Sequence, residues 1–193
     1  MNPEKLAIPA IVLITGHPCT GKTTLAKALA QDLRLPLTCR DDFKETLLDT
    51  LCQSTEEWSN RLSVASWKLL YQQIERLLSA GVDQIVESNF DPIYADAKWA
   101  SLRQGYSFRL LQIRCEANAE VLLSRYRERI ANGTRHPGHA DRSSDPAFLD
   151  LIRQGPMDWI DIESERLVVE TNILDKENHL AVAMAVRRFL MPT

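Results

Sequence analysis

A short segment near the N-terminus constrains the fold more than any other part of this chain. An apolar run at residues 10–14 is followed by Gly16, four further residues, Gly21, Lys22 and Thr23, and then by apolar residues at helical spacing. Glycines at these positions let the backbone of a loop approach a ligand closely, and a helix that begins there directs its free N–H groups at the same point. The order strand, glycine-containing loop and helix is the context that a phosphate-binding loop requires.

In a loop of this kind the side chains have predicted roles. Successive backbone N–H groups would surround phosphate oxygens, Lys22 would bridge the β- and γ-phosphates, and the Thr23 hydroxyl would bind Mg²⁺. The motif predicts a nucleotide but no particular reaction. The predicted nucleotide-binding residues of the loop are Gly16, His17, Pro18, Cys19, Thr20, Gly21, Lys22, Thr23 and Thr24.

Apolar runs and helical patterns alternate along the chain. Continuous apolar runs are typical of strands buried on both faces of a parallel sheet. They cover residues 10–15, 36–39 (the weakest), 84–88, 108–115 and 166–171. Helical spacing of apolar residues is found at 22–33, 56–79, 92–103, 118–131 and 176–190. We therefore predict an α/β fold with a parallel sheet, right-handed crossovers and helices on both faces.

The polar segment at residues 131–146 interrupts this alternation. It is rich in glycine and proline and has almost no apolar side chain. Loops of this length are usually functional lids or disordered linkers, and the position of this one between two predicted helices favours a lid. Arg135 and Arg142 lie within it, and Arg129 lies just before it. We predict one domain over residues 1–193 with an arginine-bearing lid at about 131–146.

The composition limits the partners that we expect. The formal net charge of −3 gives no overall positive field for a polyanion. The four cysteines show no metal-ligand spacing, which favours a reducing compartment. The first apolar run is too short for a signal peptide or a membrane span. We expect a cytoplasmic protein without a membrane partner, and the sequence does not indicate its oligomeric state.

Charged residues follow the predicted strand at residues 36–39. Asp41 and Asp42 lie between Arg40 and Lys44, at the edge of the sheet where ligands bind in parallel α/β folds. A carboxylate there could accept the proton of an attacking hydroxyl. The alternative for one of the two is a helix N-cap.

Two further groups of charged residues are candidates for the site. Glu87 ends an apolar run, so it could lie near Mg²⁺ or a substrate hydroxyl with Asn89 beside it, or it could be a solvated strand end. Arg125 and Arg129 are four residues apart and therefore share one helix face. Cations there would stabilise the charge on a transferring phosphoryl group, and a solvated helix face is the alternative.

These motifs together resemble one family. The matching elements are GHPCTGKTTLA at 16–26, RDDFK at 40–44, ESN at 87–89 and the arginine-bearing segment at 125–142. They are similar to the small P-loop kinases, also described as AAA-family ATPases, that include the kinase domain of bacteriophage polynucleotide kinase, chloramphenicol phosphotransferase and zeta-type toxins. The resemblance implies a P-loop NTPase fold with five parallel strands in the order 2-3-1-4-5.

The resemblance also implies roles for individual residues. Asp41 would activate the acceptor hydroxyl, and Arg125 and Arg129 would clamp the phosphates. The adenine would lie near the loop around Thr171 and Asn172. This chain carries Glu87 where the family usually carries an aspartate.

We therefore expect an ATP-dependent, Mg²⁺-requiring kinase that phosphorylates a hydroxyl of a small molecule. The rivals are a polynucleotide 5′-hydroxyl kinase, which needs a basic channel with stacking aromatic residues, and a non-catalytic nucleotide-binding switch, which needs no base. The expected catalytic residues are Lys22, Asp41, Arg125 and Arg129, with Arg135 on the nucleotide. The expected acceptor-binding residues are Arg40, Asp42, Lys44, Glu87 and Asn89, within an acceptor region at 42–80 and 90–100 that includes Trp58, Trp67 and Tyr94.

Overall fold

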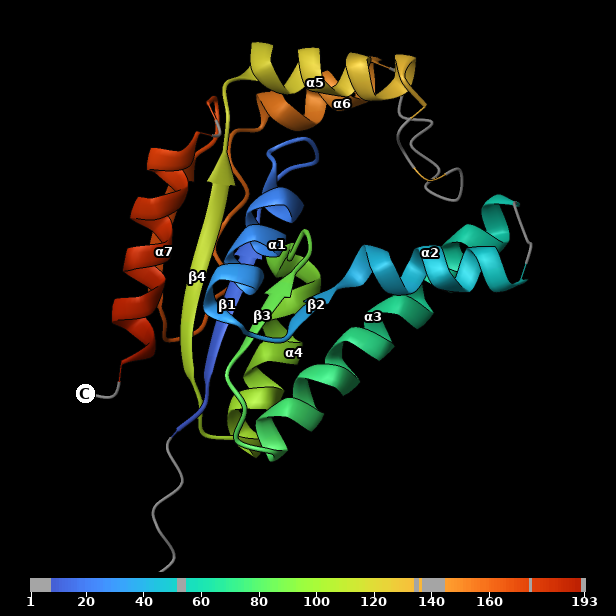
Figure 1. The fold of residues 1–193 in the computed structure, drawn as a ribbon. Coiled ribbons are helices and arrows are strands. Elements are labelled where there is room, and N and C mark those ends of the chain that lie inside the picture. The colour runs from blue at the N-terminus through green and yellow to red at the C-terminus, as the bar shows by residue number, and fades with distance from the viewer. Residues whose placement is uncertain (1–7, 52–54, 134–135, 137–144, 174, 192–193) are drawn as a thin grey trace, which may run out of the picture.

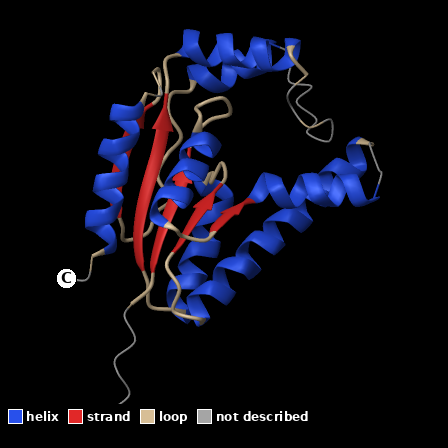
Figure 2. Ribbon diagram, viewed as in Figure 1, coloured by secondary structure: helices blue, strands red, loops and turns tan. Residues whose placement is uncertain are grey.

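A parallel sheet forms the centre of the protein. The computed structural model describes residues 8–51, 55–133, 136, 145–173 and 175–191. Its strands are β1 (Ala10–Thr15), β2 (Leu37–Cys39), β3 (Gln84–Glu87), β4 (Arg109–Glu116) and β5 (Glu165–Glu170). They pair in parallel in the order β2-β3-β1-β4-β5, which confirms the predicted fold and strand order (Figures 1 and 2).

The helices follow the predicted pattern, with two additions. They are α1 (Lys22–Leu33), α2 (Arg40–Leu51), α3 (Glu56–Ser79), α4 (Pro92–Gly105), α5 (Ala119–Ala131), α6 (Asp145–Arg153) and α7 (Lys176–Leu190). Five of these agree with the predicted ranges to within two residues at each end. Three of them begin with a side-chain cap, as in α4, where Asp91 accepts from the N–H of Ile93 and proline is the first helical residue.

The helices α2 and α6 were not predicted as elements. The helix α2 begins at Arg40, directly after β2, so the acidic pair forms its first turn rather than a loop before it. The helix α6 begins at Asp145, so the prediction of a loop is wrong for residues 145 and 146. Most of the predicted lid, including Arg135 and Arg142, lies outside the described residues.

Each face of the sheet is covered by a pair of helices, as Figure 2 shows. Val12 and Ile14 of β1 point to the face that packs on α1 and α7. Ile11 and Leu13 point to the opposite face, which packs on α3 and α4. The strand is therefore apolar at every position because both of its faces are buried.

A third apolar cluster lies where α5 and α6 cross the carboxyl ends of the strands (Figure 1). Tyr126 of α5 stacks on Phe148 of α6 with ring centroids 4.4 Å apart. Cys19, from the loop between β1 and α1, packs against this cluster. The helix pair thus supports the loop from the side of β4. On the other side of the sheet, α2 and the start of α3 project outward (Figure 1).

None of the helices in the described part of the chain is both long enough and apolar enough to cross a membrane.

The aromatic cluster behind the sheet gives a test of the fold. Trp99 is fully buried against Tyr71, Phe90 and Phe108. We predict that Trp99→Ala lowers the free energy of unfolding by about 3–5 kcal/mol through the cavity that it leaves. Ile93 lies on the same helix but is 84% exposed, so Ile93→Ala should change the free energy of unfolding by less than about 0.5 kcal/mol. Urea denaturation of both variants measures the difference, and equal losses would contradict this packing.

Candidate active site

The loop between β1 and α1 has the backbone conformation of an anion-binding turn. Gly16 has φ +144°, and a Cβ there would lie 2.5 Å from the carbonyl oxygen of Cys115, so glycine is required. Gly21 is left-handed at the N-cap of α1, and no side chain caps the helix. The free N–H groups of the first turn of α1 are therefore available to an anion.

Cys19 is a second unusual position in this loop. It has φ 67°, in the left-handed region that non-glycine residues seldom adopt. Such a conformation costs about 1–3 kcal/mol and persists where surrounding contacts hold it. Here those contacts come from the α5–α6 cluster and from Arg125, which donates to the Cys19 carbonyl at 3.3 Å. The loop is thus held in a strained shape by the elements above it.

Lys22 and Thr23 both meet Glu87, which ends β3. The Thr23 hydroxyl donates to Glu87 Oε2 at 3.2 Å, and Lys22 Nζ lies 3.9 Å from Glu87 Oε1. Lys22 Nζ also lies 3.5 Å from the carbonyl oxygen of His17. Glu87 is only 3% exposed, which contradicts the alternative of a solvated strand end. The carboxylate at the end of β3 therefore contacts the first two residues of α1, directly after the phosphate loop.

The environment of Glu87 disfavours its charge. Burial raises the pKa of Glu87, and the charge of Asp41 raises it further. Lys22 and the hydrogen bonds from Thr23 and Cys39 oppose this shift, but the net pKa stays above the ordinary value. The Cys39 thiol is itself buried, and burial raises the pKa of Cys39, so it acts as a hydrogen-bond donor to the carboxylate.

The oxygen donors at this point suit Mg²⁺. Mg²⁺ is usually held by one or two carboxylates together with substrate phosphates and water, rather than by a cage of protein ligands. The Thr23 hydroxyl and the Glu87 carboxylate provide such a partial set. Among the described residues, no three His, Cys, Asp or Glu side chains form a complete protein metal site.

The acidic pair begins α2 at the carboxyl end of β2. Asp41 is 47% exposed at its side chain, and its carboxylate lies 3.6 Å from the Arg40 guanidinium. Its charge acts on Glu87, whereas the charge of Asp42 acts on Cys39. Asp41 is therefore half-exposed at the carboxyl edge of the sheet and near enough to Glu87 for the two charges to interact.

Arg40 is turned away from the solvent and anchored to α3. Its side chain is 14% exposed, and it donates to the hydroxyls of Ser63 and Ser66 at 3.1 and 3.3 Å. The guanidinium also lies over the ring of Trp67, 5.1 Å from the ring centroid. Burial lowers the pKa of Arg40, and Asp41 partly restores it.

Lys44 does not reach the same space. It is buried and donates to the Ser59 hydroxyl of α3 at 3.1 Å, so it packs α2 on α3. Sequence reasoning placed Lys44 on the acceptor because it flanks the acidic pair, together with Arg40, at the edge of the sheet where ligands bind. The spacing of Arg40 and Lys44 indicates a shared helix face but not that the face is open to a ligand.

The two arginines of α5 have different surroundings. Arg125 donates to the carbonyl oxygens of Cys19, Thr171 and Asn172 at 3.3, 2.6 and 3.2 Å, so it joins α5 to the phosphate loop and to the loop after β5. Arg129 is half-buried and has no hydrogen bond or ion pair to the part of the chain that the structure describes. Of the predicted clamp, Arg129 is the cation that remains available to a phosphate.

Sequence reasoning missed a second link to the phosphate loop. The Nε2 atom of His17 lies 2.7 Å from the carbonyl oxygen of Gly155, which follows α6. The partners of His17 and Arg125 are backbone carbonyls, which carry no residue-type signal, so no pattern in the sequence could have indicated either contact.

A large cavity opens beside Arg40 and Asn89, between α3 and α4. Its volume is about 870 Å³, and Trp67 and Tyr94 line it as the sequence analysis expected for the acceptor region. Trp58 does not line it, since its ring instead lies 5.7 Å from the guanidinium of Arg61. The cavity adjoins the acidic pair through Arg40, which contacts Asp41.

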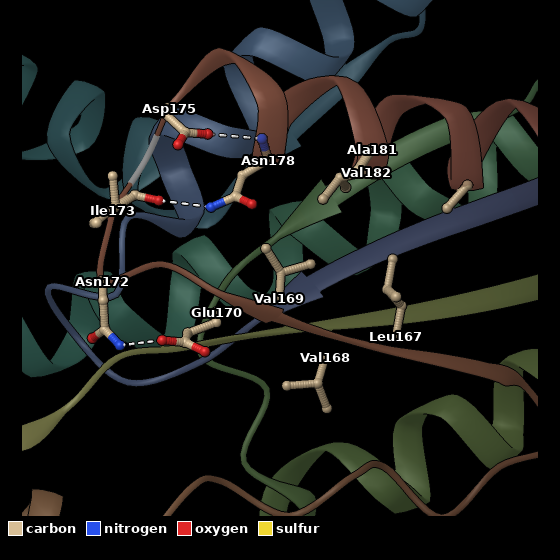
Figure 3. A pocket seen from close by; sticks show the side chains of 11 residues that line it. Leu167, Val168, Val169, Glu170, Asn172, Ile173, Asp175, Asn178, Ala181 and Val182 are labelled. Atoms are coloured by element: carbon tan, nitrogen blue, oxygen red, sulfur yellow. Dashed lines mark hydrogen bonds between the residues drawn. The ribbon is translucent and has the colours of Figure 1, made fainter.

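A second groove of about 450 Å³ lies between β5 and α7 (Figure 3). Its polar end is closed by internal hydrogen bonds: Asp175 accepts from the Asn178 N–H, and the Asn178 side chain donates to the Ile173 carbonyl. The groove lies at the edge of the sheet, with β4 between it and the phosphate loop. It borders Asn172, where the resemblance placed the adenine, but it contains none of the loop residues.

Comparisons with known proteins agree with this fold. The family model described as an AAA domain matches residues 11–145. The chain belongs to this AAA-domain family. The match covers all four motifs that carry the resemblance to P-loop kinases: the phosphate loop, the acidic pair, the Glu87 strand end and the arginine-bearing segment at 125–142. No curated protein matches the chain.

Solved structures extend the comparison to nearly the whole chain. A candidate kinase from Chloroflexus aurantiacus is 40% identical, with a TM-score of 0.88 over 95% of this chain and 99% of that one. Shikimate kinase from Bacteroides thetaiotaomicron is 17% identical, with a TM-score of 0.55 over 94% and 98%. APS kinase from Mycobacterium tuberculosis, solved with AMPPNP and APS, is 13% identical, with a TM-score of 0.59 over 95% and 98%. The last two share the fold.

The raised pKa of Glu87 gives a test of this site. In the window between the ordinary carboxyl pKa of 4.5 and the raised folded value, the folded state binds more protons than the unfolded state, so stability falls as the pH rises. We predict that Glu87→Gln, measured without nucleotide or metal, unfolds at a higher temperature than the unmodified protein at pH 8. The difference should vanish below about pH 4.5, and a lower melting temperature for the variant at pH 8 would contradict the assignment.

Proposed function

We propose that this protein is an ATP-dependent phosphotransferase that transfers the γ-phosphoryl group of ATP to a hydroxyl of a small molecule. The observation that carries the proposal is the convergence of Lys22, Thr23 and Glu87 at the phosphate loop, together with a half-exposed Asp41 whose carboxylate lies 3.6 Å from Arg40, a lining residue of the adjoining cavity. A nucleotide and an acceptor alcohol can therefore meet at one point. The kinase named for the 40% identical relative supports the same reaction class.

The phosphate loop would hold and polarise the triphosphate. The backbone N–H groups of residues 17–23 would bind the β-phosphate, and Lys22 would move from the His17 carbonyl to the β- and γ-phosphates. Thr23 and Glu87 would hold Mg²⁺, which neutralises charge on the phosphate oxygens as the bond to the leaving group breaks. The adenine would lie by the loop that Arg125 supports, near Asn172.

Asp41 would act as the general base. The acceptor hydroxyl oxygen attacks the γ-phosphorus, its proton passes to the Asp41 carboxylate, and ADP leaves with the electrons of the broken P–O bond. Arg40 holds Asp41 from one side, while the exposed side of the carboxylate faces the acceptor. Arg129, joined by Arg135 of the predicted lid, would stabilise the charge on the transferring group.

Among the expected acceptor residues, Arg40 and Asn89 line the cavity. Asp42 would support the first turn of α2. Lys44 would act indirectly, by holding α2 against α3 through Ser59. We therefore assign Arg40 and Asn89 to contact with the acceptor, and Asp42 and Lys44 to the positioning of α2.

The roles of the two aspartates can be separated by substitution. We predict that Asp41→Asn keeps the affinity for ATP but lowers turnover by about 10²–10⁴-fold, the range for the loss of a general base. Asp42→Asn is the matched control and should lower turnover much less. Transfer from labelled ATP to a panel of alcohols, with nucleotide binding measured in parallel, provides the readout. A larger loss at Asp42 would reverse the assignment.

A further inference from the structure

The cavity beside Arg40 is much longer than a simple alcohol requires. One wall is formed by α3 from Ser63 to Glu75, and the other by the start of α4 from Asp91 to Lys98. Twelve residues of helix correspond to about 18 Å along the axis. Arg40, whose partner is Asp41, marks the reaction end, and Lys98 lies two turns along α4 from Asp91. An acceptor that fills the cavity must extend well beyond its hydroxyl.

The walls of the cavity carry apolar side chains that are open to solvent. Tyr94 is 79% exposed and Val64 is 57% exposed, although both are large and apolar over most of their surface. Between them lie the rings of Trp67 and Tyr71, stacked with centroids 6.0 Å apart. A contiguous exposed apolar surface beside a polar site is typical of a binding surface. These rings provide planar contacts for a ring or an apolar chain.

The charged residues of the cavity are mostly cations. Lys68 on α3 and Lys98 on α4 face it with Arg40, and neither lysine forms an ion pair with any residue that the structure describes. The carboxylates are Glu75 and Asp91, and Asp91 already accepts from the N–H of Ile93 as the cap of α4. Two lysines without an ion-pair partner among the described residues therefore face the cavity, in a chain whose net charge is −3.

We propose that the acceptor is an elongated alcohol with an aromatic or apolar body and an anionic group. Its hydroxyl lies at Asp41, its body packs on Trp67 and Tyr94, and its anionic group pairs with Lys68 and Lys98. This assignment rests on the phosphotransferase function proposed above and narrows it to one acceptor class. This acceptor class excludes short neutral polyols as the preferred acceptors. A short polyol would not cover the apolar side chains of the cavity and would not pair with the two lysines.

A matched series of primary alcohols tests the length of the acceptor. The probes are benzyl alcohol, 4-biphenylmethanol, 4′-(hydroxymethyl)biphenyl-4-carboxylate and the corresponding carboxamide. We expect kcat/KM to rise about tenfold from benzyl alcohol to biphenylmethanol because the second ring buries apolar surface on the cavity wall. We expect a further increase of about tenfold for the carboxylate over the carboxamide.

Two variants locate these preferences in the cavity. Lys98→Gln should abolish the preference for carboxylate over carboxamide by raising KM for the acid, with kcat unchanged. Tyr94→Ser should lower the ratio of biphenylmethanol to benzyl alcohol through KM. Lys176→Gln removes an exposed lysine from α7, outside the cavity, and should alter neither ratio.

The outcomes separate this inference from the function on which it rests. Three results would overturn the acceptor class and leave the phosphotransferase function standing. They are equal kcat/KM for the acid and its amide, an equal loss of kcat/KM for both in Lys98→Gln, and better transfer to glycerol than to the biphenyl alcohols. Preferred, strongly salt-sensitive labelling of a 5′-hydroxyl oligonucleotide would replace the small acceptor by a polyanion. No transfer to any alcohol, with ATP bound, would remove both proposals.

Discussion

Glu87 is a buried carboxylate, and the phosphate loop is arranged around it. Removing such a group from water costs several kcal/mol unless nearby donors and cations compensate. Lys22, Thr23 and the Cys39 thiol supply that compensation from two different elements, and the pKa of Glu87 is nevertheless raised. The start of α1, β2 and β3 therefore meet at one buried carboxylate whose charge the fold disfavours. The account of the site depends on that charge being needed for nucleotide chemistry.

Much of the fold could be predicted because its signals are local. Runs such as residues 10–15 are apolar at every position, since β1 packs on helices at both faces, and Gly16 and Gly21 occupy backbone conformations that other residues avoid. The strand order followed from the resemblance to a family and not from the residue pattern. Local signals also placed Glu87 and Asp41 at strand ends, but burial of Glu87 depends on Thr23, which is 64 residues away.

The remainder could not be predicted because it depends on long-range contacts or on backbone atoms. The sequence predicts Arg125 as a phosphate ligand, but in the structure it donates to three backbone carbonyl oxygens. Every residue type has a backbone carbonyl, so no residue pattern could predict these contacts. The helix α6 has only nine residues and directly follows the polar segment, and the packing of Phe148 depends on its stacking on Tyr126 of α5. Arg40 and Lys44 both donate to serine hydroxyls of α3, but Arg40 also lines the cavity whereas Lys44 is buried beside Ser59, a difference that depends on how α2 packs on α3.

The most direct test of the account is the binding of AMPPNP to the phosphate loop, measured by titration calorimetry with and without Mg²⁺. Lys22 lies at the start of α1 and is not part of an apolar cluster, so Lys22→Ala should keep the fold, although it removes a cation that lowers the pKa of the buried Glu87. We predict Mg²⁺-dependent binding by the unmodified protein and a loss of at least about tenfold in affinity in Lys22→Ala, as expected for removal of a charge-assisted contact to phosphate. Equal affinity in the two proteins would contradict the claim that this loop is the nucleotide site.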